Sequence, residues 1–277
     1  MKYCTIIIII LIIIILLLYL QIKYDSIPIA IDDHIYIINR YTSNIINTKT
    51  DSNKLITPIN KKNKILIITL ETRKDEPYVI EHNKNISAYA DKYGFDYKFM
   101  SECSKNIYWC KLFVVREALE TSKYDYVMWL DSDTLILDFN YDLNKILNSY
   151  SSDLFFVDDN VSYTNTINAG VYIIKNSIIG KSYLDDCLKK YNTSCINSIT
   201  KKLKGKWACT CYEQGQMNLI AEKAYLDNLT IFSKEICICA DKIKKLKTKH
   251  FILHYYSTSV PLRNYIFTYI NNSIGIK

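Results

Sequence analysis

Short apolar runs alternate with helical segments between residues 64 and 130, and this alternation constrains the fold more than any other feature of the sequence. The runs are rich in β-branched or aromatic residues and have the length of buried strands. Between them lie apolar residues at helical spacing, with Asp75 suited to an N-cap, Pro77 to a first turn and Gly94 to a helix end. Strands that alternate with helices predict a parallel α/β sheet with crossover helices. The predicted strands are residues 64–70, 95–100 and 124–130, and the predicted helices are residues 75–93 and 109–119.

The rest of the chain continues this pattern and supplies enough apolar residues for a core. Of the 277 residues, 49% are hydrophobic, which excludes a disordered or fibrous chain. The net charge of +7 is spread along the chain and does not favour nucleic-acid binding. Further strands that extend the same sheet are predicted at residues 153–157, 169–174, 229–232 and 251–255, with helices at residues 177–191 and 212–223.

An almost pure Ile and Leu run occupies residues 5–20 and is uncharged. Its length lies between that of a short transmembrane helix and that of a long signal-peptide core. A retained anchor is favoured over a cleaved signal peptide, because no A-x-A-like cleavage site follows the run. We therefore expect a single-pass type II membrane protein, with its main domain on the lumenal side of the endoplasmic reticulum, the Golgi or an equivalent host membrane. The predicted parts are a cytosolic tail (residues 1–4), a transmembrane signal anchor (5–22), a stem (23–63) and the main domain (64–277).

Eight of the nine cysteines follow the predicted anchor, and an even number in a lumenal domain permits disulfides. Cys187 with Cys195, and the two C-x-C pairs at residues 209–211 and 237–239, are candidate partners. Reduced, buried cysteines are the alternative. A zinc site is disfavoured, because C-x-C lacks the usual ligand gap and no histidine stands close to either pair.

The segment Y-D-Y-V-M-W-L-D-S-D-T-L-I-L at residues 124–137 is the most informative for function. An apolar strand ends there in two carboxylates, Asp131 and Asp133, separated only by Ser132. Ligands bind outside the carboxyl ends of strands in open α/β sheets. Two carboxylates on the same side of an extended chain repel each other, which favours a divalent cation such as Mn²⁺ or Mg²⁺ that bridges to a substrate phosphate. A solvated turn is the alternative, but the apolar run directly before the acidic pair disfavours it.

This acidic pair resembles the D-x-D site of glycosyltransferases with the GT-A fold. Further motifs in the same order resemble the family of retaining α-galactosyl-, α-mannosyl- and xyloglucan xylosyltransferases over most of residues 64–256. The resemblance implies an α/β GT-A domain, Rossmann-like, with a mostly parallel mixed sheet flanked by helices, behind the N-terminal transmembrane helix. The motifs are N-I-S-A-Y-A-D-K-Y-G-F-D-Y (85–97), Y-W-C-K-L-F-V-V-R (108–116), W-L-D-S-D (129–133), N-A-G-V-Y-I-I-K-N (168–176), Y-E-Q-G-Q-M-N-L (212–219) and F-I-L-H-Y (251–255).

The resemblance implies transfer of a hexose or pentose, with retention, from a UDP- or GDP-sugar to a glycan or glycoprotein acceptor. Asp131 and Asp133 would hold Mn²⁺ or Mg²⁺ against the donor diphosphate, and His254 would complete the metal shell. His250 is the rival histidine. If residues 250–254 form a regular strand, the two histidines lie ~13 Å apart and cannot both bind one metal.

The resemblance also implies a set of donor-binding and catalytic residues. Lys111 and Arg116 would neutralise the donor phosphate or buttress the aspartates, with solvated helix charges as the alternative. A small residue at Gly170 would permit close approach of the sugar. The implied donor contacts are Thr69, Leu70 and Glu71 near the nucleotide base, Asn168, Ala169 and Gly170 facing the sugar, and Glu213 and Gln214 beside the anomeric carbon.

Two departures from the family pattern affect the expected function. The pair Glu213-Gln214 stands where the family often has Asp-Gln. Ser257 and Ser259 stand where a Gly and a phosphate-binding Lys are usual, so Arg263 is the candidate to take over the role of that lysine. The missing lysine supports a catalytically inactive, sugar-binding protein as one alternative function. An aspartyl phosphohydrolase is the other, because D-S-D-T-L is similar to a D-x-D-x-T motif, although the threonine stands one position early and the motif normally follows the first strand of its domain.

Overall fold

The computed structural model describes residues 61–158, 167–205, 208–232, 236–239 and 250–276. The predicted anchor at residues 5–22 and residues 23–60 of the predicted stem lie outside these ranges, so both stay predictions. Within the described ranges, no helix is long and apolar enough to cross a membrane.

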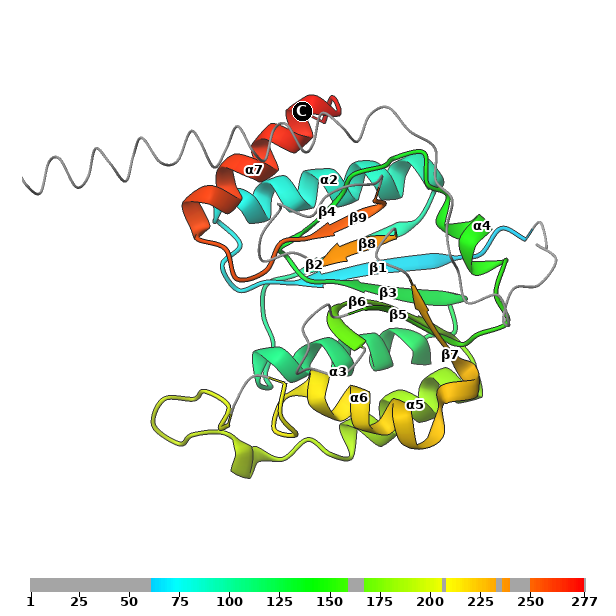
Figure 1. The fold of residues 1–277 in the computed structure, drawn as a ribbon, viewed down its shortest axis with the longest axis vertical. Helices are drawn as coiled ribbons and strands as arrows, with labels where there is room; N and C mark the ends of the chain where they lie inside the picture. The colour runs from blue at the N-terminus through cyan, green and yellow to red at the C-terminus, as the bar shows by residue number, and fades with distance from the viewer. Residues whose placement is uncertain (1–60, 159–166, 206–207, 233–235, 240–249, 277) are drawn as a thin grey trace, which may run out of the picture. The chain divides into compact units, whose positions relative to one another are not determined.

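A six-stranded sheet in the order β2-β1-β3-β6-β5-β7 forms the centre of the domain (Figure 1). β6 is antiparallel to its neighbours β3 and β5, whereas the pairs β1–β2, β1–β3 and β5–β7 are parallel. The structure therefore confirms a mostly parallel mixed sheet. Its strands are β1 (Ile65–Leu70), β2 (Asp96–Met100), β3 (Tyr126–Leu130), β5 (Leu154–Asp158), β6 (Ile167–Lys175) and β7 (Leu229–Phe232).

A second, three-stranded sheet lies beside the first and has the order β4-β9-β8. The strands are β4 (Thr134–Ile136), β9 (Ile252–His254) and β8 (Cys237–Cys239). The prediction that residues 251–255 extend the main sheet is therefore wrong, although they do form a strand. An apolar run determines that a strand is buried but not which strand it pairs with, and β4, which pairs with β9, was not predicted.

Helices cover both faces of the main sheet (Figure 1). α2 and α7 lie on the side of the second sheet, and α3, α5 and α6 cover the opposite face. α7 was not predicted. The helices are α2 (Pro77–Tyr93), α3 (Ile107–Glu120), α4 (Leu143–Leu147), α5 (Ile178–Leu188), α6 (Glu213–Ala224) and α7 (Val260–Ser273), with short 3-10 turns at Thr193–Cys195 and Leu226–Asn228.

The ends of α2 show how the local sequence sets an element. Glu76, rather than the predicted Asp75, is the N-cap, and its side chain makes no capping hydrogen bond. Pro77 begins the helix, where its missing N–H costs nothing. Gly94 ends it at φ 69°, a left-handed conformation that favours glycine. The Gly94 N–H donates hydrogen bonds to carbonyl oxygens of the last turn.

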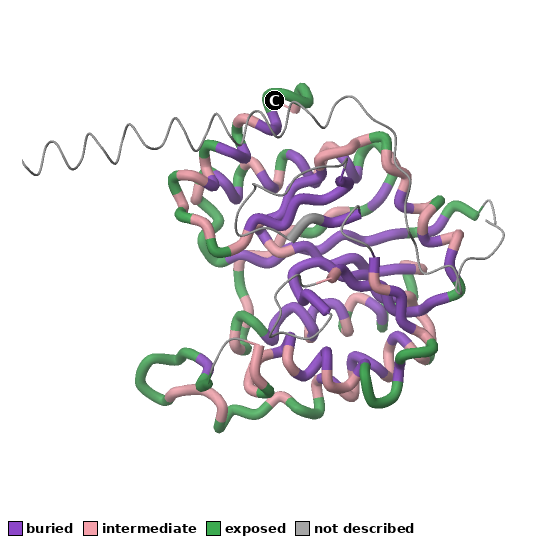
Figure 2. Tube along the Cα trace, in the orientation of Figure 1, coloured by how far each residue is buried: buried purple, intermediate pink, exposed green. Residues whose placement is uncertain are grey.

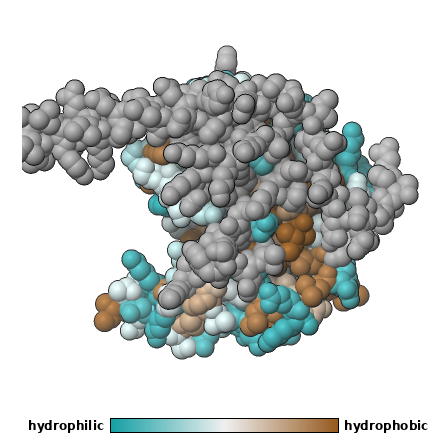
Figure 3. All heavy atoms as spheres, in the orientation of Figure 1, coloured by the Kyte–Doolittle hydropathy of each residue, from teal (hydrophilic) through white to brown (hydrophobic). Residues whose placement is uncertain are grey.

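Two apolar cores lie on the two faces of the main sheet, whose strands are mostly buried except for the edge strand β2 (Figure 2). Trp109 and Tyr172 are fully buried on the side of α3, and Tyr89 and Phe155 on the side of α2. Burial of each such side chain stabilises the fold by about 1.5–3 kcal/mol. Outside these cores, the visible surface over α5 and α6 mixes hydrophilic and hydrophobic side chains (Figure 3).

Two disulfides cross-link the segments around α3 and α6. Cys103 is bonded to Cys110 in the first turn of α3, and Cys195 is bonded to Cys211, just before α6. The candidate pairing of Cys187 with Cys195 is wrong, because Cys187 is a free thiol buried in α5. The C-x-C pairs are not bonded internally either, because Cys209 and Cys237 are free thiols.

Candidate active site

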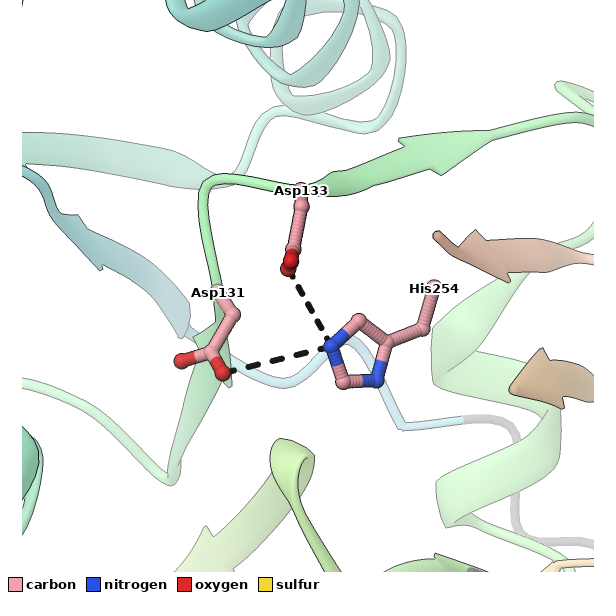
Figure 4. A group of neighbouring side chains, drawn as sticks. All are labelled: Asp131, Asp133 and His254. Atoms are coloured by element: carbon pink, nitrogen blue, oxygen red, sulfur yellow. Dashed lines mark ion pairs between the residues drawn. The ribbon is translucent and has the colours of Figure 1, made fainter. Parts of the chain in front are cut away.

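The acidic pair lies where the chain leaves the main sheet and enters the second one. The buried strand β3 ends at Leu130, and the Asp131 N–H donates to the Gly170 carbonyl of β6 at 2.8 Å. The Thr134 N–H and hydroxyl both donate to the Asp131 carbonyl, at 3.1 and 2.8 Å, which closes a tight turn around Ser132. The carboxylates of Asp131 and Asp133 therefore face the same space, as the sequence predicts (Figure 4).

His254 completes this group from the second sheet. β9 pairs antiparallel with β4, so that His254 lies opposite Thr134, one residue after Asp133. The imidazole Nε2 lies 3.1 Å from Asp133 Oδ1 and 4.0 Å from Asp131 Oδ2 (Figure 4). One ligand atom from each of the three residues lies within 4.8 Å of the others, and His250 is not a member of the group.

The group fits a divalent cation of the Mn²⁺ or Mg²⁺ kind. Two carboxylates and one imidazole form a donor set typical of such ions. Gly170 leaves the space next to them open: a Cβ built there would lie 2.9 Å from Asp131 Oδ2 and closer still to the His254 ring. Any larger residue at this position would therefore displace a ligand.

A buried cation, Lys111 of α3, holds the first aspartate. Its ammonium donates to Asp131 Oδ1 at 2.9 Å and to the Ala169 carbonyl at 3.2 Å, and it lies 3.3 Å from Glu213 Oε1. Burial lowers the pKa of Lys111, but Asp131 and Glu213 more than reverse this effect, so the lysine stays charged. The Trp129 indole N–H also donates to Asp131 Oδ1, at 2.7 Å.

The second aspartate is balanced by different groups. Burial raises the pKa of Asp133, but His254 and Arg263 more than reverse this effect and hold the pKa well below its ordinary value. Arg263 belongs to α7, and its guanidinium lies 3.5 Å from Asp133 Oδ2 and over the Tyr78 ring, 4.8 Å from the ring centre. The sequence singled out Arg263, although it did not predict α7.

The start of α6 places Glu213 and Gln214 against the same space. Glu213 is fully buried, and burial raises its pKa, an effect that Lys111 opposes only in part. Gln214 Oε1 accepts a hydrogen bond from the Ala169 N–H at 3.0 Å, and Asn168 Oδ1 accepts one from the Gly170 N–H at 2.8 Å. These contacts fix the backbone of β6 beside the metal-binding group.

The carboxyl end of β1 contributes Leu70 and Glu71, whereas Thr69 points into the interior. Thr69 Oγ1 lies 2.9 Å from the Leu130 carbonyl oxygen and 2.9 Å from His82 Nε2. Glu71 accepts hydrogen bonds from the Ser132 hydroxyl at 2.8 Å and from the Arg73 guanidinium at 2.7 Å. Burial raises the pKa of Glu71, but Arg73 and Ser132 more than reverse this effect and lower it to about 2.

Two further residues were not predicted. Arg73 stands two residues after Glu71, in a segment outside any helix or strand. No periodic pattern in this segment predicts where the Arg73 side chain points. His82 is fully buried, and its Nδ1 lies 2.7 Å from the Thr134 carbonyl, so this nitrogen carries the proton. Burial lowers the pKa of His82 to about 4. The spacing of Tyr78, His82 and Ile86 along α2 is the signal that places this histidine on the buried helix face.

Arg116 is directed away from the cavity described below, and two other expected site residues, Thr69 and Ala169, do not line it either. The Arg116 guanidinium is bonded to Asp185 of α5 at 2.7 Å and to Glu120. Lys111 and Arg116 are five residues apart, which separates them by about 140° around a helix. Helical geometry alone therefore puts the two cations on different faces of α3.

The groups described above share one cavity of about 720 Å³, which lies within the range for small-molecule sites. Its residues come from the carboxyl ends of β1 and β3, from the starts of β6, α3 and α6, and from the segment around β9 and α7. The cavity is lined by Leu70, Glu71, Thr72, Arg73, Ile107, Tyr108, Lys111, Trp129, Asp131, Ser132, Asp133, Asn168, Gly170, Glu213, Gln214, His254, Tyr256, Ser257 and Arg263.

Comparison with known proteins agrees with this arrangement. Residues 60–150, which include both aspartates, match the galactosyl transferase GMA12/MNN10 family. The crystal structure of a glycosyltransferase involved in the glycosylation of the major capsid of PBCV-1 aligns with a TM-score of 0.56 and 15% sequence identity, over 74% of this chain and 99% of that chain. The described domain has the GT-A glycosyltransferase fold. Together with the family match, this fold supports a transferase.

Other comparisons add little. The apo-form glycosyltransferase GlyE of Streptococcus pneumoniae TIGR4 aligns with a TM-score of 0.49 and 15% identity, over 76% of this chain and 62% of that chain. No curated protein matches the sequence. The roles of the individual site residues therefore depend on the geometry above.

Proposed function

We propose that the protein is a divalent-metal-dependent glycosyltransferase that moves a hexose or pentose from a UDP- or GDP-sugar to a glycan or glycoprotein acceptor, with retention of configuration. The observation that carries the proposal is the convergence of Asp131, Asp133 and His254 in a cavity of about 720 Å³. The match to a galactosyl transferase family over residues 60–150 supports the same reaction class.

The proposed chemistry divides the cavity into three regions. Asp131, Asp133 and His254 would hold the metal, which supplies charge neutralisation for the departing diphosphate. Arg263 and Arg73 line the cavity on the side of β1 and α7, where either guanidinium can take the place of the missing phosphate-binding lysine. The bond from the anomeric carbon to the phosphate oxygen breaks with its electron pair, a bond to the acceptor oxygen forms, and the acceptor proton leaves with the diphosphate.

Glu213 and Gln214 would act beside the anomeric carbon. Glu213 is buried and lies next to Lys111, so an anionic carboxylate there is stabilised by one fixed cation. Positive charge that develops on the sugar as the diphosphate departs is stabilised by such a carboxylate without solvent reorganisation. Gln214, whose side-chain oxygen is already bonded to the backbone of β6, would position the sugar rather than react with it.

The proposal includes a location. Residues 5–22 would anchor the protein in the membrane as a single-pass type II protein, residues 23–63 would form a stem, and residues 64–277 would lie in the lumen. The disulfides Cys103–Cys110 and Cys195–Cys211 support an oxidising compartment. The protein should partition with membranes and keep its first residues. A mature N-terminus near Asp32, found by sequencing, would contradict the anchor.

A donor screen tests the activity. The full chain, purified in detergent, is incubated with Mn²⁺ or Mg²⁺ and a panel of UDP- and GDP-sugars, and released nucleoside diphosphate is measured. The Asp133→Asn variant keeps the size of the side chain but removes its charge, so release should fall by orders of magnitude. Donor binding without release would indicate an inactive sugar-binding protein. Release of phosphate from a phosphomonoester would instead indicate a phosphohydrolase.

A further inference from the structure

We propose that Ile107 and Tyr108, at the start of α3, form a binding subsite for a pyranose ring of the acceptor. This inference rests on the proposed function and identifies the acceptor class as a carbohydrate, bound through the apolar face of one sugar ring. Ile107 is 41% exposed and Tyr108 is 37% exposed, although both line the cavity. Within the described ranges, no other large hydrophobic residue that lines the cavity is as exposed as these two.

The two ends of the cavity differ in chemistry. Glu71, Arg73 and Arg263, which are charged, lie at the end formed by β1 and α7. The end formed by α3 and α6 has two charged residues that are buried, Lys111 and Glu213, and two apolar residues that are exposed, Ile107 and Tyr108. The metal-binding group lies between these ends, because Asp131 contacts Lys111 of α3 and Asp133 contacts Arg263 of α7. A nucleoside diphosphate held at the end formed by β1 and α7 leaves the exposed apolar surface of Ile107 and Tyr108 for the second substrate.

The position of Tyr108 relative to the reacting groups supports a sugar ring as the occupant. Tyr108 and Lys111 are three residues apart on α3. Their side chains are therefore neighbours on one helix face, with the Cβ atoms ~5 Å apart. Lys111 contacts Asp131 and Glu213, and Tyr108 therefore lies about one sugar ring farther out from the proposed reaction centre. A pyranose presents C–H groups on one face, and these pack against an aromatic ring while the hydroxyl groups stay in contact with water.

The rim of the cavity at Tyr108 is held rigid, as a binding surface requires. The Tyr108 ring packs edge-to-face on Tyr212, with the ring centres 5.3 Å apart, and Tyr212 directly precedes Glu213. One disulfide, Cys103–Cys110, ties the first turn of α3 to the preceding loop, and Cys195–Cys211 holds the segment before Tyr212. The Trp109 indole N–H joins the two cross-linked segments by donating to the Cys211 carbonyl at 3.0 Å. A preformed aromatic surface loses little conformational entropy when it binds a ligand.

The test uses the full chain in detergent, with Mn²⁺ and a donor that the wild type cleaves. Methyl hexopyranosides and methyl pentopyranosides are the acceptor probes, and a serine-containing peptide is the comparison probe. The KM for the glycoside, the KM for the donor and the mass of the product are measured. Tyr108→Ala should raise the glycoside KM about tenfold, equivalent to ~1.4 kcal/mol, and should raise it at least fivefold more than the donor KM.

Three variants serve as comparisons. Tyr108→Phe keeps the stacking surface and should restore the wild-type glycoside KM. Ile107→Ser should raise the glycoside KM without removing the tyrosine ring. Tyr265→Ala is the matched control, because Tyr265 is 43% exposed and stacked on Tyr269 of α7 but does not line the cavity, so its KM values should equal those of the wild type.

The possible outcomes separate the two proposals. If no donor releases its nucleotide in the wild type, the proposed function fails and this inference fails with it. If the wild type cleaves a donor but Tyr108→Ala and Ile107→Ser keep the wild-type glycoside KM, only the acceptor subsite is refuted. Transfer to the peptide and to none of the glycosides would also refute the subsite.

Discussion

Replacing Gly170 by alanine should weaken metal binding without unfolding the domain. Gly170 lies in β6 opposite the acidic pair, in a conformation open to any L-residue. A Cβ there would lie 2.9 Å from Asp131 Oδ2, where ordinary contact begins at 3.4 Å, and closer still to the His254 ring. Asp131 must therefore move by about 0.5 Å and the His254 ring by more, which exceeds the tolerance of about 0.5 Å within which such a site must be held.

The size of the effect follows from the loss of one well-placed ligand. We expect Mn²⁺ affinity to fall about 10–100-fold in Gly170→Ala, a loss of ~1.4–2.8 kcal/mol. The free energy of unfolding without metal should change little, because two effects oppose each other. Alanine lowers the entropy of the unfolded chain, which stabilises the fold by up to about 1 kcal/mol, whereas its Cβ strains the site. Titration calorimetry gives the affinity, and the rise in Tm on adding Mn²⁺ gives an independent measure that needs no substrate.

Val171→Ala is the matched control for this prediction. Val171 is the next residue of β6 and is buried in the core on the other face of the sheet. Its truncation should lower the free energy of unfolding by about 1–3 kcal/mol while the Mn²⁺ affinity stays at the wild-type value. Wild-type Mn²⁺ affinity in Gly170→Ala, or equal losses of affinity in both variants, would refute the placement of the metal beside Gly170.

Three further predictions address other parts of the domain. His254→Ala should raise the Mn²⁺ concentration needed for activity about tenfold or more, whereas His250→Ala should leave it unchanged; the reverse result would place the wrong histidine at the site. The ionised carboxylate of Glu71, with a pKa lowered to about 2 from 4.5, stabilises the fold above pH 4.5 and loses this contribution as the pH falls toward 2. Glu71→Gln should thus lower the free energy of unfolding by about 1–2 kcal/mol at pH 7. This value is smaller than the pKa shift alone would give, because solvent screens the charge of the half-exposed Arg73. Near pH 2, denaturant titrations should show no difference between the variant and the wild type. Peptide mapping without reduction should recover two cross-linked pairs, Cys103–Cys110 and Cys195–Cys211. A peptide that joins Cys187 to Cys195 would contradict the structure.

The sequence by itself determined the elements of the domain and the centre of its site. Each strand and helix predicted between residues 64 and 130 is present, because apolar periodicity and helix-ending residues such as Gly94 act over a few neighbouring positions. The approach of Asp131 and Asp133 also follows locally, since a strand end with one intervening residue directs both carboxylates to one side. His254 was placed by resemblance, and the structure brings it within 3.1 Å of Asp133.

Only the tertiary structure decided which distant surfaces meet. The composition of residues 251–255 predicts a strand, but its pairing with β4 rather than with the main sheet depends on the turn around Ser132, which directs the chain into β4. The partner of Cys195 depends on how the segment between α5 and α6 folds back on itself. Arg116 pairs with Asp185 because its face of α3 meets α5. These contacts join residues that are from 16 to more than 100 positions apart, and they stabilise the fold only after the chain has closed the loops between them. Local patterns therefore specify the pieces, while the pairing of surfaces specifies the cavity.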